Sequence, residues 1–170
     1  WKPTMITVML MIFQQFSGIN AVMFYLTDIF KDAKTGLSPG VCALLVSVAL
    51  VIATFISGMV MDRYGRTILL NVSGLGHVIT LILMGGFYQI DPAAKWLPVV
   101  FLMLFVIFFS FGYGPIPWMI AGEITPNEAK PMVSSIGSST NWLCVFFTTK
   151  FFSLLADAIT IQGAYWFFAG

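Results

Sequence analysis

A group of uncharged polar side chains lies inside an otherwise apolar stretch near the start of the chain. It holds two glutamines, a serine and an asparagine within seven residues: Gln14, Gln15, Ser17 and Asn20. A carboxamide buried in hydrocarbon without a partner costs roughly 2–7 kcal/mol, so these groups must bind the protein, water or a polar solute. Neutral donors and acceptors suit a neutral polyhydroxylated ligand such as a sugar. The alternative is that they form hydrogen bonds between helices.

Helical geometry restricts what Gln15 and Asn20 can do together. Successive residues of an α-helix turn by about 100°, so residues five apart point about 140° away from each other. The two amides can face one cavity only if the helix is bent or unwound between them. Ser17 and Gly18 lie at this point, and glycine and serine pairs commonly mark kinks. We therefore predict a broken helix here, of the kind at which secondary transporters bind substrates.

A second segment combines helix-breaking residues with an aromatic ring. Gly114, Pro115 and Pro117 come directly before Trp118. Proline removes a helix donor and clashes with the preceding carbonyls, so this segment is predicted to break a span and to let it flex. The Trp118 ring suits the C–H face of a sugar, and its N–H suits a hydroxyl. A static kink with an interfacial tryptophan is the alternative.

Charged residues in two connectors can form a third constellation. Arg63 and Arg66 belong to the segment 62–66, and Glu123 and Lys130 belong to a later connector on the same side. Cations and carboxylates at helix ends can hold one face of a bundle shut through charge-assisted hydrogen bonds. The alternative is a solvated loop whose cations anchor the topology.

The composition indicates a membrane protein. Of 170 residues, 59% are hydrophobic and 9% are charged, whereas soluble domains carry about 25% charged residues. The net charge of +1 gives no basic footprint for nucleic acid. The sequence shows no nucleophile–base pair, no metal-ligand spacing and no phosphate-binding loop. It therefore predicts no enzyme activity, no metal and no cofactor.

Long apolar runs without period-two alternation predict an all-α membrane protein. A spanning helix needs about 20 mostly apolar residues, and the predicted spans are 4–27, 39–61, 68–89, 97–122, 131–156 and a partial span at 163–170. The connectors hold nearly all the charge: 28–34, 62–66, 91–95, 123–130 and 157. The chain opens without an initiator methionine or a signal peptide pattern, and we expect it to be a fragment of a longer protein.

Polar residues in two later spans have structural interpretations. His77 is expected to form a hydrogen bond between helices, with a proton relay as the alternative. Ser135 and Ser139 stand one turn apart before Asn141, and we expect this small-residue face to allow close helix packing.

These motifs together resemble the sugar porter family of the major facilitator superfamily, and the resemblance covers nearly the whole chain. In that family's order they match helix seven, the loop between helices eight and nine, helix ten and helix eleven, through residues 14–20, 62–66, 114–118 with Glu123, and 141–142. The resemblance is to facilitative hexose and trehalose transporters. It implies the C-terminal six-helix half of a twelve-helix fold, with the last helix truncated and the N-terminal half missing.

The resemblance also implies roles for individual residues. Sugar hydroxyls would bind Gln14, Gln15 and Asn20, and Trp118 would line the site. The outer gate would contain Phe24 and Tyr25, and Gly114, Pro115 and Pro117 would let the tenth helix move. The cytoplasmic gate would contain Arg63, Arg66 and Glu123. The protein would be a multi-pass integral protein of the plasma membrane or an endomembrane, in contact with the lipid bilayer.

Departures from the family pattern bear on the substrate. Thr67 follows Arg66 where the family has a further arginine, and Ser110 stands where glucose carriers have a glutamate. Leu50 and Val145 replace asparagines of the glucose-binding set. These changes permit a different or larger sugar. The sequence thus predicts transport of a hexose or trehalose by alternating access and facilitated diffusion. A non-transporting sugar sensor or scaffold and a proton-coupled symporter are the alternatives.

Overall fold

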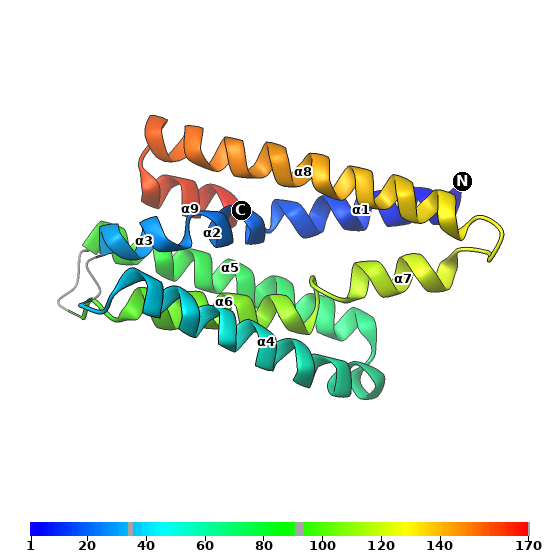
Figure 1. Cartoon of the computed structure of the whole chain (residues 1–170), viewed down its shortest axis with the longest axis horizontal. Coiled ribbons are helices and arrows are strands. Elements are labelled where there is room, and N and C mark those ends of the chain that lie inside the picture. Colours follow the sequence, from blue (N-terminus) through cyan, green and yellow to red (C-terminus); the bar gives the residue numbers. More distant parts are fainter. Residues whose placement is uncertain (34–35, 91–93, 170) are drawn as a thin grey trace.

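The computed structural model describes residues 1–33, 36–90 and 94–169, and across these ranges it is all-helical (Figure 1). Residues 34–35, 91–93 and 170, which belong to two predicted connectors and to the predicted last span, lie outside the described residues. The described helices are α1 (Lys2–Phe16), α2 (Ile19–Phe24), α3 (Leu26–Ala33), α4 (Pro39–Tyr64), α5 (Arg66–Ile90), α6 (Leu97–Phe111), α7 (Ile116–Ile124), α8 (Lys130–Ala158) and α9 (Ile161–Ala169).

The first predicted span is divided into three helices. Helix α1 ends at Phe16, and α2 begins at Ile19 after Gly18, whose φ is +81°. Glycine reaches positive φ without the steric cost that other residues meet there. A second interruption follows at Tyr25, before α3. The predicted break at Ser17 and Gly18 is thus confirmed.

A second break separates α6 from α7. Helix α6 ends at Phe111 and α7 begins at Ile116. Gly112 packs so closely on α5 that an added Cβ would lie 2.4 Å from the Ser73 Cβ and 2.7 Å from the Leu69 carbonyl oxygen. Since a side chain does not fit there and Pro115 cannot donate a backbone hydrogen bond, the chain leaves the helix at the predicted segment.

Three stretches of the described chain are long and apolar enough to cross a membrane. They are Pro39–Met61, Arg66–Ile90 and Leu97–Ile124, close to the predicted spans at 39–61, 68–89 and 97–122. The first predicted span is interrupted by its breaks. The span predicted at 131–156 falls within α8, whose first turns are rich in serine. Membrane crossing by these two stretches stays a prediction.

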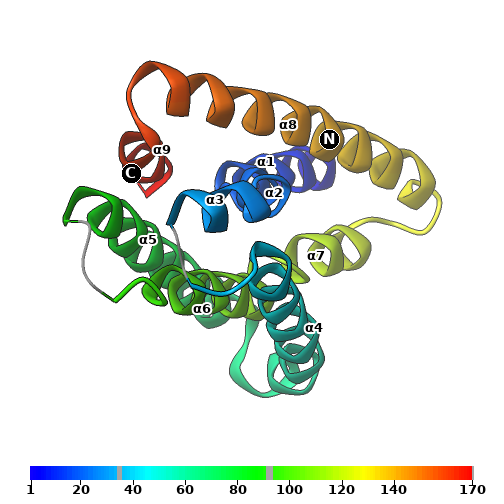
Figure 2. The same cartoon turned by 60° about the vertical axis from the view of Figure 1, so that its left-hand side comes forward.

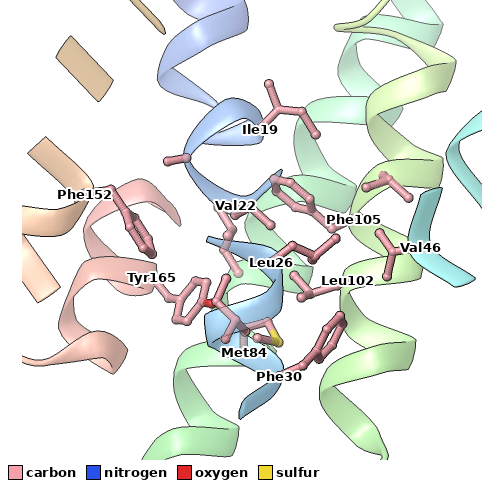
Figure 3. Close-up of a cluster of buried hydrophobic side chains, with 14 of the residues drawn as sticks. Ile19, Val22, Leu26, Phe30, Val46, Met84, Leu102, Phe105, Phe152 and Tyr165 are labelled. Atoms are coloured by element: carbon pink, nitrogen blue, oxygen red, sulfur yellow. The ribbon is translucent and has the colours of Figure 1, made fainter. Parts of the chain in front are cut away.

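The helices pack around α2 and α3. Helix α8 runs along α1, while α5 packs against α6 and α9, and α4 packs against α6 (Figures 1 and 2). The main core lies where α2 and α3 meet the other helices, and Figure 3 shows the labelled side chains that form it: Ile19, Val22, Leu26, Phe30, Val46, Met84, Leu102, Phe105, Phe152 and Tyr165. This core fixes the segment that follows the first break.

Close packing of α1 on α8 uses a different small residue from the pair that we expected. Ser135 and Ser139 are both exposed. Gly137 is buried instead, and an added Cβ there would lie 2.9 Å from Thr7 Cγ2. The two serines do not pack on α1, because Gly137 lies on the buried face of α8 together with Asn141, one turn further along.

We predict that Gly76→Ala destabilises the protein while Gly86→Ala does not. Both glycines lie inside α5, so both changes bring the same gain in helix propensity. A Cβ on Gly76 would lie 2.1 Å from Phe108 Cγ, whereas a Cβ on Gly86 meets nothing within 4 Å. Overpacking of this kind costs about 1–3 kcal/mol. Thermal unfolding in detergent should show a lower midpoint for Gly76→Ala alone, and equal midpoints would contradict the packing of α5 on α6.

Candidate functional site

Gln14 ties three parts of the bundle together. Its Nε2 donates to the backbone oxygens of Tyr113 at 2.7 Å and Gly114 at 2.9 Å, and its Oε1 accepts from Asn141 Nδ2 at 2.8 Å. The side chain is 3% exposed. Both donor hydrogens are therefore used, and one oxygen lone pair remains. In this conformation Gln14 forms the interhelical hydrogen bonds that were the alternative to sugar binding.

Gln15 and Asn20 meet each other across the first break. Asn20 Nδ2 donates to Gln15 Oε1, which is possible because Gly18 turns the chain between them. Among the described residues, no hydrogen bond engages Gln15 Nε2 or Asn20 Oδ1. The pair thus offers one free donor group and one free acceptor. A sugar hydroxyl, which both accepts and donates, can satisfy the two together.

The α6–α7 break is held from both sides at Tyr113. The Tyr113 N–H donates to Ser73 Oγ at 3.2 Å, while its carbonyl accepts from Gln14. Within the break, the Gly114 N–H donates to the Phe109 carbonyl at 2.9 Å. The amino-acid sequence does not indicate this role of Ser73, because Ser73 is one polar residue in an apolar helix and the motif that contains it, Asn71-Val72-Ser73, matches a glycosylation sequon. Only the close approach of Gly112 reveals its position.

Two of the three predicted aromatic residues are exposed. Trp118 is in the first turn of α7 and is 44% exposed, and Phe24 ends α2 and is 64% exposed. The Tyr25 ring stacks on Phe152 with centroids 5.7 Å apart. Within the described part of the chain, no hydrogen bond joins Trp118 to Gln15 or Asn20. Trp118 and Phe24 therefore present free ring surface.

One ion pair forms among the described residues of the charged constellation. Arg66, the first residue of α5, pairs with Glu123 near the end of α7. Their side chains are 42% and 47% exposed. Arg63 is exposed and has no ion pair among the described residues. Surface pairs contribute about 0–1 kcal/mol, so this contact can bias a gate but cannot hold it shut alone.

His77 does not join two helices as expected. Its Nδ1 lies 2.8 Å from the Ser73 carbonyl, one turn earlier on the same helix. A carbonyl only accepts, so Nδ1 carries the hydrogen. The ring packs against Phe105 and Tyr113 at centroid distances of 4.6 and 5.6 Å. The expectation was wrong because Nδ1 binds the carbonyl one turn earlier and the buried Nε2 has no hydrogen-bond partner among the described residues.

Comparison with known proteins decides the family. The whole chain, residues 1–170, matches the family model described as "Sugar (and other) transporter". The chain belongs to this sugar transporter family. Its fold is that of the major facilitator superfamily, and it is a multi-pass integral membrane protein.

Individual relatives of this family support the assignment. The chain is 41% identical to the facilitated trehalose transporter Tret1 of Aedes aegypti, over 98% of this chain and 22% of that protein. It is 42% identical to trehalose transporter 1 of Drosophila melanogaster, over 98% of this chain and 20% of that protein. The chain therefore spans between 20% and 22% of the length of these two relatives.

Solved structures of one transporter, XylE, have the same fold as this chain. The proton:xylose symporter XylE bound to 6-bromo-6-deoxy-D-glucose gives a TM-score of 0.84 at 29% identity, covering 98% of this chain and 36% of that one. The inward open conformation of XylE from E. coli gives 0.83 at 26% identity, covering 98% of this chain and 35% of that one.

We predict that Gln14→Ala destabilises this sugar transporter family member more than Gln15→Ala does. The two glutamines are neighbours with 3% and 4% exposure. Gln14→Ala loses two hydrogen bonds to the break between α6 and α7 and one to α8, whereas Gln15→Ala loses one within its own span. At roughly 0.5–1.5 kcal/mol per hydrogen bond, the difference is about 1–3 kcal/mol. Unfolding midpoints should rank accordingly, and an equal loss would refute the role of Gln14 as a tie.

A double-mutant cycle should detect the Arg66–Glu123 pair. With both residues changed to alanine singly and together, we expect a coupling of up to about 1 kcal/mol. It should largely vanish at about 1 M salt, where the screening length is near 3 Å. The cycle between Arg63 and Glu123 serves as the control and should give no coupling. Equal coupling in the two cycles would contradict a specific pair.

Proposed function

We propose that this chain forms part of a transporter that carries a neutral sugar across a membrane by alternating access. One observation carries the proposal: at the first helix break, Gln15 and Asn20 bind each other and leave one donor and one acceptor free. Uncharged amides of this kind suit sugar hydroxyls. Support comes from relatives named trehalose transporters and from the solved xylose symporter.

Each site residue then has a distinct role in the proposal. Gln15 Nε2 donates to a sugar hydroxyl and Asn20 Oδ1 accepts from one. Trp118 offers its exposed ring to a C–H face of the sugar. Gln14 positions the second break and offers only its remaining lone pair. Phe24 and Tyr25, at the interruption after α2, close the site from the outer side.

We further propose that the chain is the C-terminal six-helix half of a twelve-helix transporter. The chain covers only 36% of the symporter chain that it matches, which leaves room for a second bundle. Helices α4 and α8 expose large apolar side chains such as Phe55, at 74%, and Trp142, at 68%. These faces suit lipid or a facing half, and in such folds the sugar lies between the halves.

The two breaks and the ion pair serve the conformational cycle in this proposal. Gly18 lets α2 tilt relative to α1, and the segment with Gly114, Pro115 and Pro117 lets α7 tilt relative to α6. The end of the bundle that carries Lys2 faces the cytoplasm. There the Arg66–Glu123 pair, together with the exposed Arg63 near the end of α4, forms a gate that opens as α7 moves away from α5.

We propose facilitated diffusion rather than proton coupling. Proton-coupled transport requires a titratable group within the membrane. The acidic residues of the described helices lie near helix ends or in α3, and His77, the single histidine, binds the Ser73 carbonyl within its own helix. The relative from Aedes aegypti is named a facilitated trehalose transporter. This chain is then a transporter component and not an enzyme.

Uptake of labelled glucose and trehalose by the complete transporter tests the proposal. Gln15→Ala should lower uptake about tenfold at equal surface expression, since an unpaired polar group costs roughly 1–3 kcal/mol. Gln89→Ala, the same change at an exposed position near the end of α5, should leave uptake unchanged. A proton uncoupler should not lower the initial rate.

The other outcomes distinguish the alternatives. Sugar binding without uptake would indicate a sensor. Uptake that collapses with the uncoupler would indicate a proton symporter. If no sugar is carried, or if Gln15→Ala behaves as Gln89→Ala does, the proposal fails.

A further inference from the structure

A groove of about 360 Å3 lies between the end of α2 and α8. Its α2 side is formed by Phe24 and Tyr25. Its α8 side includes Trp142, Phe146 and Thr149. The volume is within the range of about 300–1,000 Å3 that is usual for small-molecule sites. The proposed sugar contacts leave most of this lining without a role.

The groove continues the amide site along both helices. On α2, Phe24 follows Asn20 by four residues, so the two side chains share a face and lie one turn apart. On α8, Val145 stands one turn beyond Asn141, and Thr149 one turn beyond Val145. Asn20 belongs to the open pair and Asn141 binds Gln14. The groove lining on each helix therefore starts one turn beyond an amide residue, Asn20 on α2 and Asn141 on α8.

The lining combines aromatic faces with hydrogen-bonding groups. Trp142 and Phe146 are 68% and 63% exposed. Thr149 Oγ1 is buried and lacks a hydrogen-bond partner, and Lys150 at the groove edge has no ion pair among the described residues. Ring faces take the C–H surfaces of a sugar while hydroxyl and ammonium groups take its hydroxyls. No carboxylate lines the groove, and the Lys150 ammonium is the single charged group in its lining. The lining therefore holds no group that would select a cation.

We propose that this groove is a subsite for the second ring of a neutral disaccharide whose first ring binds Gln15 and Asn20. This inference rests on the proposed function. The two rings of a disaccharide are joined through one oxygen, so the second ring lies directly beside the first. A monosaccharide leaves the groove empty. The groove thus decides between disaccharide and monosaccharide, while the amides serve both.

Two adjacent phenylalanines provide a matched test in the complete transporter. Phe146 lines the groove, whereas Phe147 lines a different one between α8, α1 and α9. The two side chains are 63% and 62% exposed, and their rings pack edge to face with centroids 5.6 Å apart. The readout is the ratio of initial trehalose uptake to initial glucose uptake, which cancels differences in expression. Phe146→Ala should lower this ratio about tenfold, the effect of one ring contact, and Phe147→Ala should not.

Thr149→Val is a second variant with almost unchanged shape. It removes only the unpaired hydroxyl and should lower the same ratio about threefold or more. If Phe146→Ala does not reach the membrane, the uptake ratio of Thr149→Val tests the subsite. A lowered ratio in the groove variants, with Phe147→Ala unaffected, supports the subsite.

The remaining outcomes overturn the subsite in distinguishable ways. If both sugars are carried and the ratio stays constant in the groove variants, the second ring does not bind there. If glucose and trehalose uptake fall together, the groove is filled by a helix of the other half. If glucose is carried and trehalose is not, the subsite fails while the proposed function stands. If neither sugar is carried, the proposed function itself fails.

Discussion

The bundle depends on how the broken backbone between α6 and α7 is satisfied. A helix interrupted inside a membrane leaves backbone groups without their helical partners, and hydrocarbon cannot replace those partners. Gln14 supplies the missing donors to the carbonyls of Tyr113 and Gly114 and is itself held by Asn141. Ser73 accepts the Tyr113 N–H from the other side. Four segments that are far apart in sequence are thereby fixed around one peptide, and α1, α5, α7 and α8 are positioned by that constraint.

The two helix breaks are linked through adjacent residues, because Gln14 binds the second break and Gln15 binds across the first to Asn20. A ligand that binds the open pair therefore acts one residue away from the tie that holds α7. A ligand shifts a conformational equilibrium only as far as its affinity differs between the states.

The sequence predicts the local features of this structure well and the long-range ones poorly. Both breaks follow from residue types, because glycine and proline act on their own backbone. The meeting of Gln15 and Asn20 follows from helical geometry once Gly18 breaks the helix. The partners of Gln14 could not be predicted, since two of them are backbone carbonyls about a hundred residues away. The contact of Ser73 with Tyr113 and the burial of Gly137 also depend on which faces of the helices meet, and residue types alone do not determine that.

A structure of the complete transporter with a bound sugar tests the central claim most directly, because it shows whether the open amide pair holds the ligand. We expect one sugar hydroxyl within about 3.2 Å of both Gln15 Nε2 and Asn20 Oδ1. Gln14 should still contact the break between α6 and α7 or should have exchanged a contact there for the sugar. A sugar bound elsewhere, with the Gln15–Asn20 pair unchanged and unoccupied, would contradict the account.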